Sequence, residues 1–438
     1  MSAWIRSCPR AQVHALAAVG LTLVVVGCSS SPPPPAVHPR PPVSLAPSSP
    51  AVDRAVATDA LLARRAQAVL HHDAKAFLAT VDPRAPAAFV QRQKALARAL
   101  ATVPFASFAL RVDPSVTPAA DTAKIAAHGA EAAWMPQTSL TYTLRGGDGT
   151  ASTLLEYYTF VERGGAWFIA SDDDTAPGAP GAQHDVWDYG PLVVVRGAAS
   201  LVLAHPGDEQ QAHDVAALAD GAVTSVTALW GTDWPRRVVV VLPRSETELQ
   251  DVVQDHADLS HFAALESAEL GRTPGRTESA QRIAVNPSVF FGQTSDQGRQ
   301  VVMTHETAHV ATAGSTRIGM PTWLIEGFAD YAGFRTVDVP LDRAAAALQA
   351  RVRASGAPQA LPTDAAFGAD AARLDEAYEE AWLACRFIAQ VEGQDALVRL
   401  YRAVGSGQTV PQAFASVLHS TVRTFTASWR AEIEAELR

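Results

Sequence analysis

Two histidines and two glutamates in the last third of the chain have the types and spacing of a catalytic zinc site. His305 and His309 stand four residues apart with Glu306 between them, and Glu326 follows 17 positions after His309. Residues four apart lie on the same face of a helix, so both imidazoles can hold one metal ion. Glu306 points about 100° away from His305, where it can act on a water without binding the metal. The pattern predicts zinc-dependent hydrolysis.

The downstream carboxylates extend this site. Glu326 lies in a largely apolar segment, residues 323–331, that follows Pro321. An unpaired carboxylate would be costly there, which favours a metal ligand over a solvated helix residue. Asp330 is one turn further on, and we expect it to accept the free ring N–H of one histidine. A structural zinc is the alternative, but such sites usually have four protein ligands and often cysteine.

The segment HETAH followed by WLIEGFADY resembles the gluzincins, the thermolysin-like and aminopeptidase-like zinc peptidases, and particularly the bacterial peptidase MA-like group. The resemblance is specific over 298–335 and looser over 190–437. In that family Asp330 corresponds to the aspartate of a Glu-x-x-x-Asp pair. The resemblance also implies that His305, His309 and Glu326 bind zinc and that Glu306 is the general base.

The resemblance also suggests how a substrate is held. The segment RIAVNP, residues 282–287, sits where gluzincins have an edge strand that pairs with an extended peptide. We expect the backbone around Ala284 and the side chain of Asn286 to bind substrate; a plain strand is the alternative. Clan aminopeptidases carry a Gly-x-Met-Glu-Asn segment, and we find no such segment before His305, so we expect an endopeptidase.

A donor for the tetrahedral oxyanion is also required. Tyr378 resembles the tyrosine that opens the helix packed over the active site in related families, although packing in the core is the alternative. His419, in a turn-like position, is the other candidate.

The N-terminus reads as an export signal followed by a tether. Residues 1–27 carry two arginines and then an apolar run, as in a signal peptide. Val25-Val26-Gly27-Cys28 resembles a bacterial lipobox, which implies lipidation of Cys28. Residues 28–52 are rich in serine and proline and predict an extended tether. An uncleaved transmembrane anchor is the alternative, and both place the folded part outside the cytoplasm, at the cell membrane.

Two folded parts follow, of the α+β class. Residues 53–187 show helices and then strands around the hairpin signal GGDG at 146–149, a pattern that resembles the cystatin-like or SnoaL-like fold. Residues 188–438 show a small sheet, then the zinc motif, and then a helical lobe, as in a gluzincin-type domain.

The composition of the chain limits the classes of partner that it can bind. The formal net charge is −10, and −10 − 2 = −12 without the leader, which carries Arg6 and Arg10. Such a surface repels phosphate backbones, and we expect no nucleic-acid partner. Three cysteines do not form a disulfide framework, and Cys385 is expected to be a buried apolar residue.

Two alternatives to a membrane-anchored zinc peptidase remain open. The chain is either an inactive peptidase-like lipoprotein that binds a protein or peptide partner, or a scaffold in which residues 53–187 do the work. An oxyanion donor over the metal distinguishes the enzyme from the inactive protein.

Overall fold

The computed structural model describes five stretches of the chain: residues 50–253, 259, 262–268, 280–368 and 373–438. The predicted signal peptide, the lipidation at Cys28 and the tether up to residue 49 lie outside these stretches. Within them, we find no helix that combines the length and the apolar character needed to cross a bilayer.

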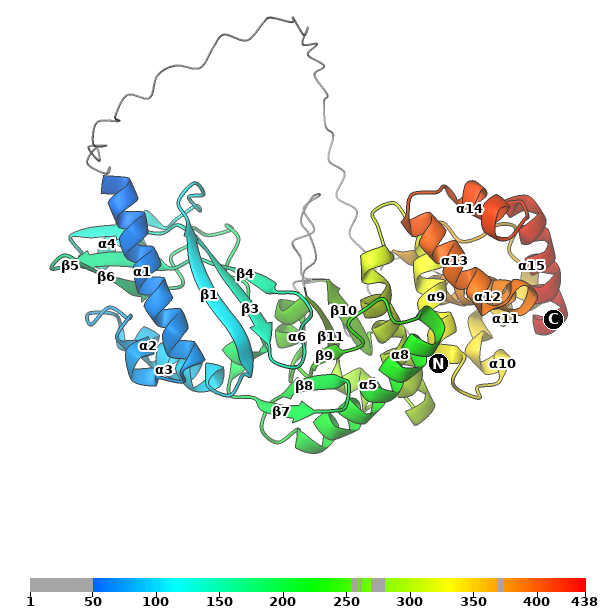
Figure 1. Cartoon of the computed structure of the whole chain (residues 1–438), viewed down its shortest axis with the longest axis horizontal. Coiled ribbons are helices and arrows are strands. Elements are labelled where there is room, and N and C mark those ends of the chain that lie inside the picture. The colour runs from blue at the N-terminus through cyan, green and yellow to red at the C-terminus, as the bar shows by residue number, and fades with distance from the viewer. Residues whose placement is uncertain (1–49, 254–258, 260–261, 269–279, 369–372) are drawn as a thin grey trace, which may run out of the picture.

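The N-terminal part begins with helices and continues with strands, as the sequence predicts. The helices α1 (Pro50–Leu70), α2 (Ala74–Leu78) and α3 (Ala87–Leu100) come first, and α4 (Thr122–Ala127) is a short later insertion. The strands form two antiparallel sheets of three. One is β1 (Phe105–Asp113), β3 (Gln137–Leu144) and β4 (Ser152–Glu156), and the other is β2 (Ala132–Trp134), β5 (Thr159–Arg163) and β6 (Ala166–Ser171). Helix α1 lies along β1 (Figure 1), and the more specific cystatin-like resemblance stays a prediction.

The strand pattern differs from the sequence prediction in two places. Residues 150–163 form a single strand-like run in the sequence but two strands in the structure, because residues 157–158 separate β4 from β5. Strand β1 is missing from the prediction. A register shift between Phe105 and Ser107 interrupts the alternation, so Phe105 and Phe108, three residues apart, are both buried in one core, at a spacing typical of a helix.

The second part is built on a five-stranded sheet with the order β10-β11-β9-β8-β7. Strands β8, β9 and β11 are parallel, while β7 and β10 pair antiparallel at the two edges. The bounds are β7 (Val193–Arg196), β8 (Ser200–Ala204), β9 (Val238–Val241), β10 (Ala264–Ala268) and β11 (Gln281–Val285). Helix α5 (Glu209–Trp230) joins β8 to β9, and α6 (Glu246–Val253) follows β9.

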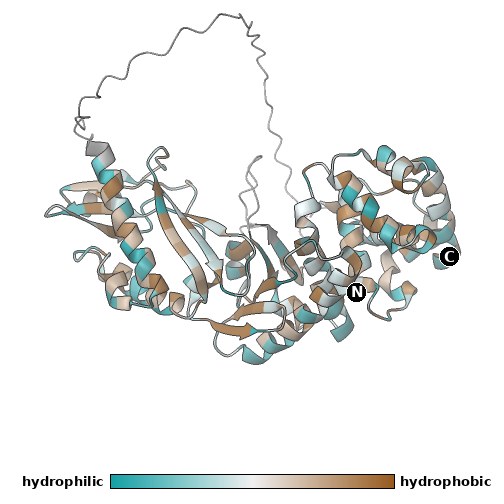
Figure 2. Cartoon of the chain, viewed as in Figure 1, coloured by the Kyte–Doolittle hydropathy of each residue, from teal (hydrophilic) through white to brown (hydrophobic). Residues whose placement is uncertain are grey.

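The two faces of this sheet belong to different cores. Alternate side chains such as Val202 and Val240 pack against the helices, whereas Leu201 and Val239 pack into the core of the N-terminal part. The N-terminal part thus covers one face of the second sheet (Figure 1). In Figure 2 the strands β1 and β8 are largely hydrophobic, and the outer side of α5 is hydrophilic.

We expect residues 188–438 alone to fold poorly. Four large apolar side chains of the sheet lose their cover: Leu201, Leu203, Val239 and Val241. Burying each contributes about 1.5–3 kcal/mol, and the total is comparable with the whole stability of a typical domain, about 5–15 kcal/mol. Circular dichroism and gel filtration of 188–438 beside 51–438 check this. A monomeric shorter chain with a cooperative melt would contradict the shared core.

The helical lobe carries the zinc motif at its start. After α7 (Pro287–Phe290) come two helices that contain all the motif residues, α8 (Asp296–Thr312) and α9 (Thr322–Phe334). The remaining helices are α10 (Leu341–Ala344), α11 (Ala346–Ser355), α12 (Leu374–Glu392), α13 (Gln394–Gly405), α14 (Val410–Val417) and α15 (Val422–Leu437). Mixed helix and sheet, with a helical C-terminal lobe, agrees with the predicted fold class.

Candidate metal centre

Helices α8 and α9 bring the predicted metal ligands together. The Ser295 hydroxyl accepts the Gly298 N–H at 3.2 Å and starts α8, so that the motif falls in its second half. The two helices approach closely, because a Cβ at Gly333 would stand 2.8 Å from the Val301 carbonyl oxygen. This close approach sets the downstream glutamate of α9 opposite the two histidines of α8.

The three predicted ligands converge at their terminal atoms. His305 Nε2 lies 3.0 Å from His309 Nε2, and Glu326 Oε2 lies 3.5 and 3.4 Å from these two nitrogens. All three side chains are buried. A tetrahedral ion with metal–ligand bonds of about 2.0–2.1 Å needs ligand atoms roughly 3.3 Å apart. The two-histidine, one-carboxylate set and its spacing therefore fit a zinc ion.

Asp330 orients the first histidine. Its Oδ1 lies 2.7 Å from His305 Nδ1, and both groups are buried. This contact leaves Nε2 of the ring to face the other ligands. Burial works against the charged ring, but the carboxylates of Asp330 and Glu326 outweigh it and raise the pKa of His305 well above its usual range. The ring is therefore strongly basic, as a good metal ligand should be.

Glu306 is buried beside the ligands with an unused oxygen. Its Oε2 forms no hydrogen bond with any described residue. Burial raises the pKa of Glu306 to about 8, the carboxylates of Glu326 and Glu266 add to this, and His305 opposes it. A buried carboxyl oxygen without a partner is costly unless a solvent or substrate group meets it. Such a group is well placed to exchange a proton with a water at the metal.

Strand β10 lies against the motif helix and supplies a residue that the sequence reasoning missed. A backbone hydrogen bond from Glu266 lowers the pKa of Glu306, while the Glu266 carboxylate raises it. Among the strands that the structure describes, β10 pairs only with β11 and is therefore the edge strand next to the site. Residues from 251 onward read as irregular in the sequence. The strand reads Ala-Leu-Glu-Ser-Ala, which has no apolar/polar alternation, so no periodic signal in the sequence could have revealed it.

The prediction that residues 282–287 form an edge strand is wrong. Strand β11 is central, since the backbone at Ala284 pairs with Leu265 on one side and Val241 on the other. The Asn286 side chain donates to the Leu259 carbonyl at 3.2 Å. The substrate-binding role predicted for Ala284 and Asn286 assumed a free strand edge, and β11 has no free edge.

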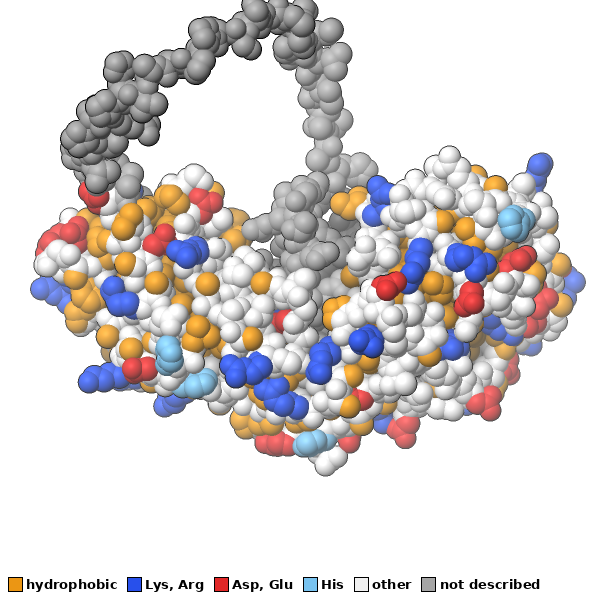
Figure 3. Space-filling model, viewed as in Figure 1, with side chains coloured by type: hydrophobic (Ala, Val, Ile, Leu, Met, Phe, Trp, Pro, Cys, Tyr) orange, Lys and Arg blue, Asp and Glu red, His pale blue; other side chains and the backbone are white. Residues whose placement is uncertain are grey.

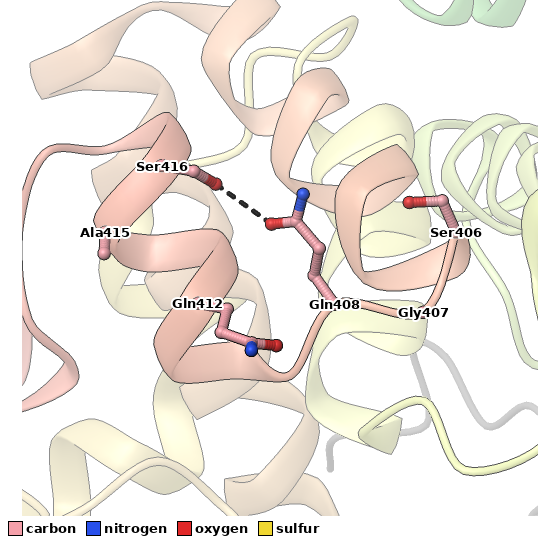
Figure 4. Close-up of a pocket in the computed structure, with 6 residues that line it drawn as sticks. All are labelled: Ser406, Gly407, Gln408, Gln412, Ala415 and Ser416. Carbon is pink, nitrogen blue, oxygen red and sulfur yellow. Dashed lines mark hydrogen bonds between the residues drawn. The ribbon is translucent and has the colours of Figure 1, made fainter.

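The other predicted residues are not among the convergent ligands. Tyr378 is buried with its ring edge-on to Phe367 at 5.2 Å, and its role as oxyanion donor stays a prediction. Cys385 is fully buried, as expected. A surface pocket of ≈ 670 Å³ lies between α13 and α14, where the Ser416 hydroxyl donates to Gln408 (Figure 4). Its lining is uncharged and includes none of the metal-site residues.

Gly327 lets α12 approach the helix that carries Glu326. A Cβ there would stand 2.3 Å from the Ala381 carbonyl oxygen. We expect Gly327→Ala to destabilise the fold by about 1–3 kcal/mol and, because Glu326 is adjacent, to weaken zinc binding. Urea unfolding and a zinc titration check this. Gly221→Ala in α5 is the control, since its Cβ meets nothing within 4 Å and should stabilise by about 0.5–1 kcal/mol. Equal effects of the two substitutions would contradict the close-packing argument.

Fold and site together define a zinc metallopeptidase-type domain. Residues 288–435 match the family model of the Peptidase MA superfamily, which confirms the predicted gluzincin-type class and, with it, zinc as the cofactor. The matched segment contains all three convergent ligands and Glu306.

Two solved structures share a distant likeness with the chain. The chain resembles a mutant M1 zinc metallopeptidase from Deinococcus radiodurans bound to a Tyr-Ser-Ala substrate, with 15% identity, a TM-score of 0.30, and coverage of 62% of this chain and 58% of that one. A two-domain M1 zinc metallopeptidase mutant bound to L-arginine gives 15% identity, a TM-score of 0.31 and the same coverage. The chain thus spans less than two thirds of the length of these proteins. No curated protein matches the chain.

Proposed function

We propose that this protein hydrolyses peptide bonds at a zinc ion held by His305, His309 and Glu326. The observation that carries the proposal is the position of Glu306, whose buried carboxylate has an oxygen with no described hydrogen-bond partner beside three convergent metal ligands. A purely structural metal site has no use for such a group, because an unpaired buried oxygen costs free energy without contributing a ligand.

Each residue has a separate task. Zinc bound at this site would polarise the scissile carbonyl and lower the pKa of a water molecule. Glu306 takes the proton from the attacking water at its free oxygen and later gives it to the leaving amine. Asp330 holds His305 with Nε2 inward, so that the ligand set needs no rearrangement before metal binds.

The substrate lies along β10 in this proposal. An extended peptide adds to a free strand edge through backbone hydrogen bonds, and β10 is the edge beside Glu306. We propose an endopeptidase, as the sequence suggested. Removal of N-terminal residues is the second candidate, because the Glu266 carboxylate near Glu306 is suited to hold a substrate ammonium group.

We further propose that the enzyme works outside the cytoplasm, anchored to the cell membrane by a lipid on Cys28. The apolar run before Cys28 and the serine- and proline-rich stretch after it support this. Cys28→Ala should move the protein from the detergent phase to the aqueous phase in detergent partitioning. If the variant stays with the membrane, an uncleaved anchor is the better explanation.

A peptide library tests the activity. Zinc-loaded 51–438 is incubated with peptides that carry free or acetylated N-termini, and the products are read by mass spectrometry. Internal cuts in both sets support an endopeptidase, and stepwise loss from free N-termini alone supports the second candidate. Folded, zinc-bound protein that cuts nothing would favour the inactive partner-binding lipoprotein.

A further inference from the structure

A buried ion pair joins the N-terminal part to the sheet of the metal domain. Asp148, in the hairpin between β3 and β4, receives two hydrogen bonds from the Arg282 guanidinium, with distances of 2.6 and 2.9 Å. The side chains are 1% and 6% exposed, respectively. The Ser152 hydroxyl accepts a third hydrogen bond from the same guanidinium, at 3.0 Å. A bidentate Asp–Arg pair out of water is strong and directional, so it fixes the position of Arg282.

The hairpin is pressed against the sheet around this pair. A Cβ at Gly147 would stand 2.6 Å from Val239 of β9, which leaves no room for a larger residue. Arg237 donates to the Gly146 carbonyl at 3.1 Å, and basic side chains gather where the two parts meet (Figure 3). The Ala280 N–H, just before β11, bonds the Ala151 carbonyl at 3.4 Å. The start of β11 is therefore held by the N-terminal part through backbone and side chain.

Strand β11 in turn holds β10. Glu266 of β10 pairs with Ile283, the residue after Arg282. Because no other strand in the described part of the chain pairs with β10, its place against Glu306 depends on the place of β11. The Asp148–Arg282 pair is thus only one strand away from β10, the strand edge next to the metal ligands.

We infer that Asp148 is a positioning residue of the N-terminal part, which sets the substrate-facing edge of the metal site through Arg282 and β11. The consequence for substrate rests on the proposed function, since it assumes that peptide pairs with β10. Misplacement of a binding edge by about 1 Å can cost up to roughly 100-fold in rate, so the pair need not touch the substrate to matter. The metal ligands lie on other elements, the helices α8 and α9.

Asp148→Asn tests the inference, with Asp82→Asn as a matched control. Asp82 forms a similar bidentate pair with Arg163, at 2.7 and 2.7 Å and with side chains 1% and 11% exposed, but wholly within the N-terminal part. We expect Asp148→Asn to raise KM for peptides by about tenfold with kcat and zinc content nearly unchanged. Asp82→Asn should lower the melting temperature about as much as Asp148→Asn does, but it should not raise KM.

Hydrogen exchange supplies a readout that does not depend on cleavage. Amides of 262–268 should exchange faster in Asp148→Asn than in the wild type or Asp82→Asn. Equal exchange and equal KM in the two variants would overturn the inference and leave Asp148 with a stabilising role only. If the wild type cuts no peptide, the exchange result still decides the positioning role, and only the proposed function fails. Should Asp148→Asn not fold, Asp148→Glu, which keeps the charge but shifts the carboxylate, is judged by the same two measurements.

Discussion

Glu306→Gln is expected to lower kcat for peptide cleavage by roughly 10²–10⁴-fold while zinc stays bound. Glutamine has nearly the same shape, so the ligands His305, His309 and Glu326 keep their places. Its amide oxygen cannot take a proton from water at neutral pH, and the buried oxygen that makes Glu306 the base is lost. Steady-state kinetics with zinc analysis of the same samples check this result. Cleavage at the wild-type rate would mean that another group is the base.

Glu380→Gln is the control for this substitution. Glu380 is also a buried glutamate with a raised pKa, about 7, but it pairs with Arg351 between α11 and α12. Loss of a buried charge alone therefore should not stop cleavage, and we expect activity within about twofold of wild type. A comparable loss in both variants would indicate damage to the fold rather than to the chemistry.

Glu306 also predicts a pH dependence for the metal-free protein. Burial raises its pKa from 4.5 in the unfolded chain to about 8 in the folded one. Between these values the folded state binds more protons, so this group makes unfolding easier as pH rises from about 5 to 8. Denaturant unfolding at several pH values should show a flatter profile for Glu306→Gln than for wild type. Parallel profiles would mean that Glu306 ionises normally in the fold.

The chemistry was easier to predict from the sequence than the substrate edge. His305, His309, Glu326 and Asp330 were placed by helical spacing, which depends only on local geometry and on the apolar stretch around Glu326. The helices after residue 296 follow their apolar periodicity closely for the same reason. Nothing in the family resemblance concerned the N-terminal part.

The order of strands could not be obtained in this way. Strand β10 is five residues long and precedes β11 in the chain, yet which of the two lies at the edge depends on β9 pairing with β11. That pairing is set by contacts distant in sequence, including the hairpin of the N-terminal part that holds Arg282. The alternation of β1 was hidden by its bulge. Long-range packing, rather than local propensity, decided each of these features.

His309→Ala is expected to remove zinc binding in the micromolar range. The change deletes one of three protein ligands and leaves a gap beside His305 Nε2, which was 3.0 Å away. The loss of affinity should exceed the 10–100-fold that removal of a partner behind a ligand costs, and Asp330→Asn supplies that comparison. Competition with a chelating indicator measures both affinities.

Thermal unfolding provides an independent test of whether His309 binds the zinc ion. Zinc at about 100 times its Kd stabilises a folded protein by about 2.7 kcal/mol, so chelator should lower the melting temperature of the wild type and of Glu306→Gln. The melting temperature of His309→Ala should not respond to zinc or chelator, because the folded state no longer binds the ion better than the unfolded state does. A wild-type response in His309→Ala would place the metal elsewhere in the chain. A reduced response in Asp330→Asn that recovers at higher zinc would show that Asp330 orients His305 and is not itself a ligand.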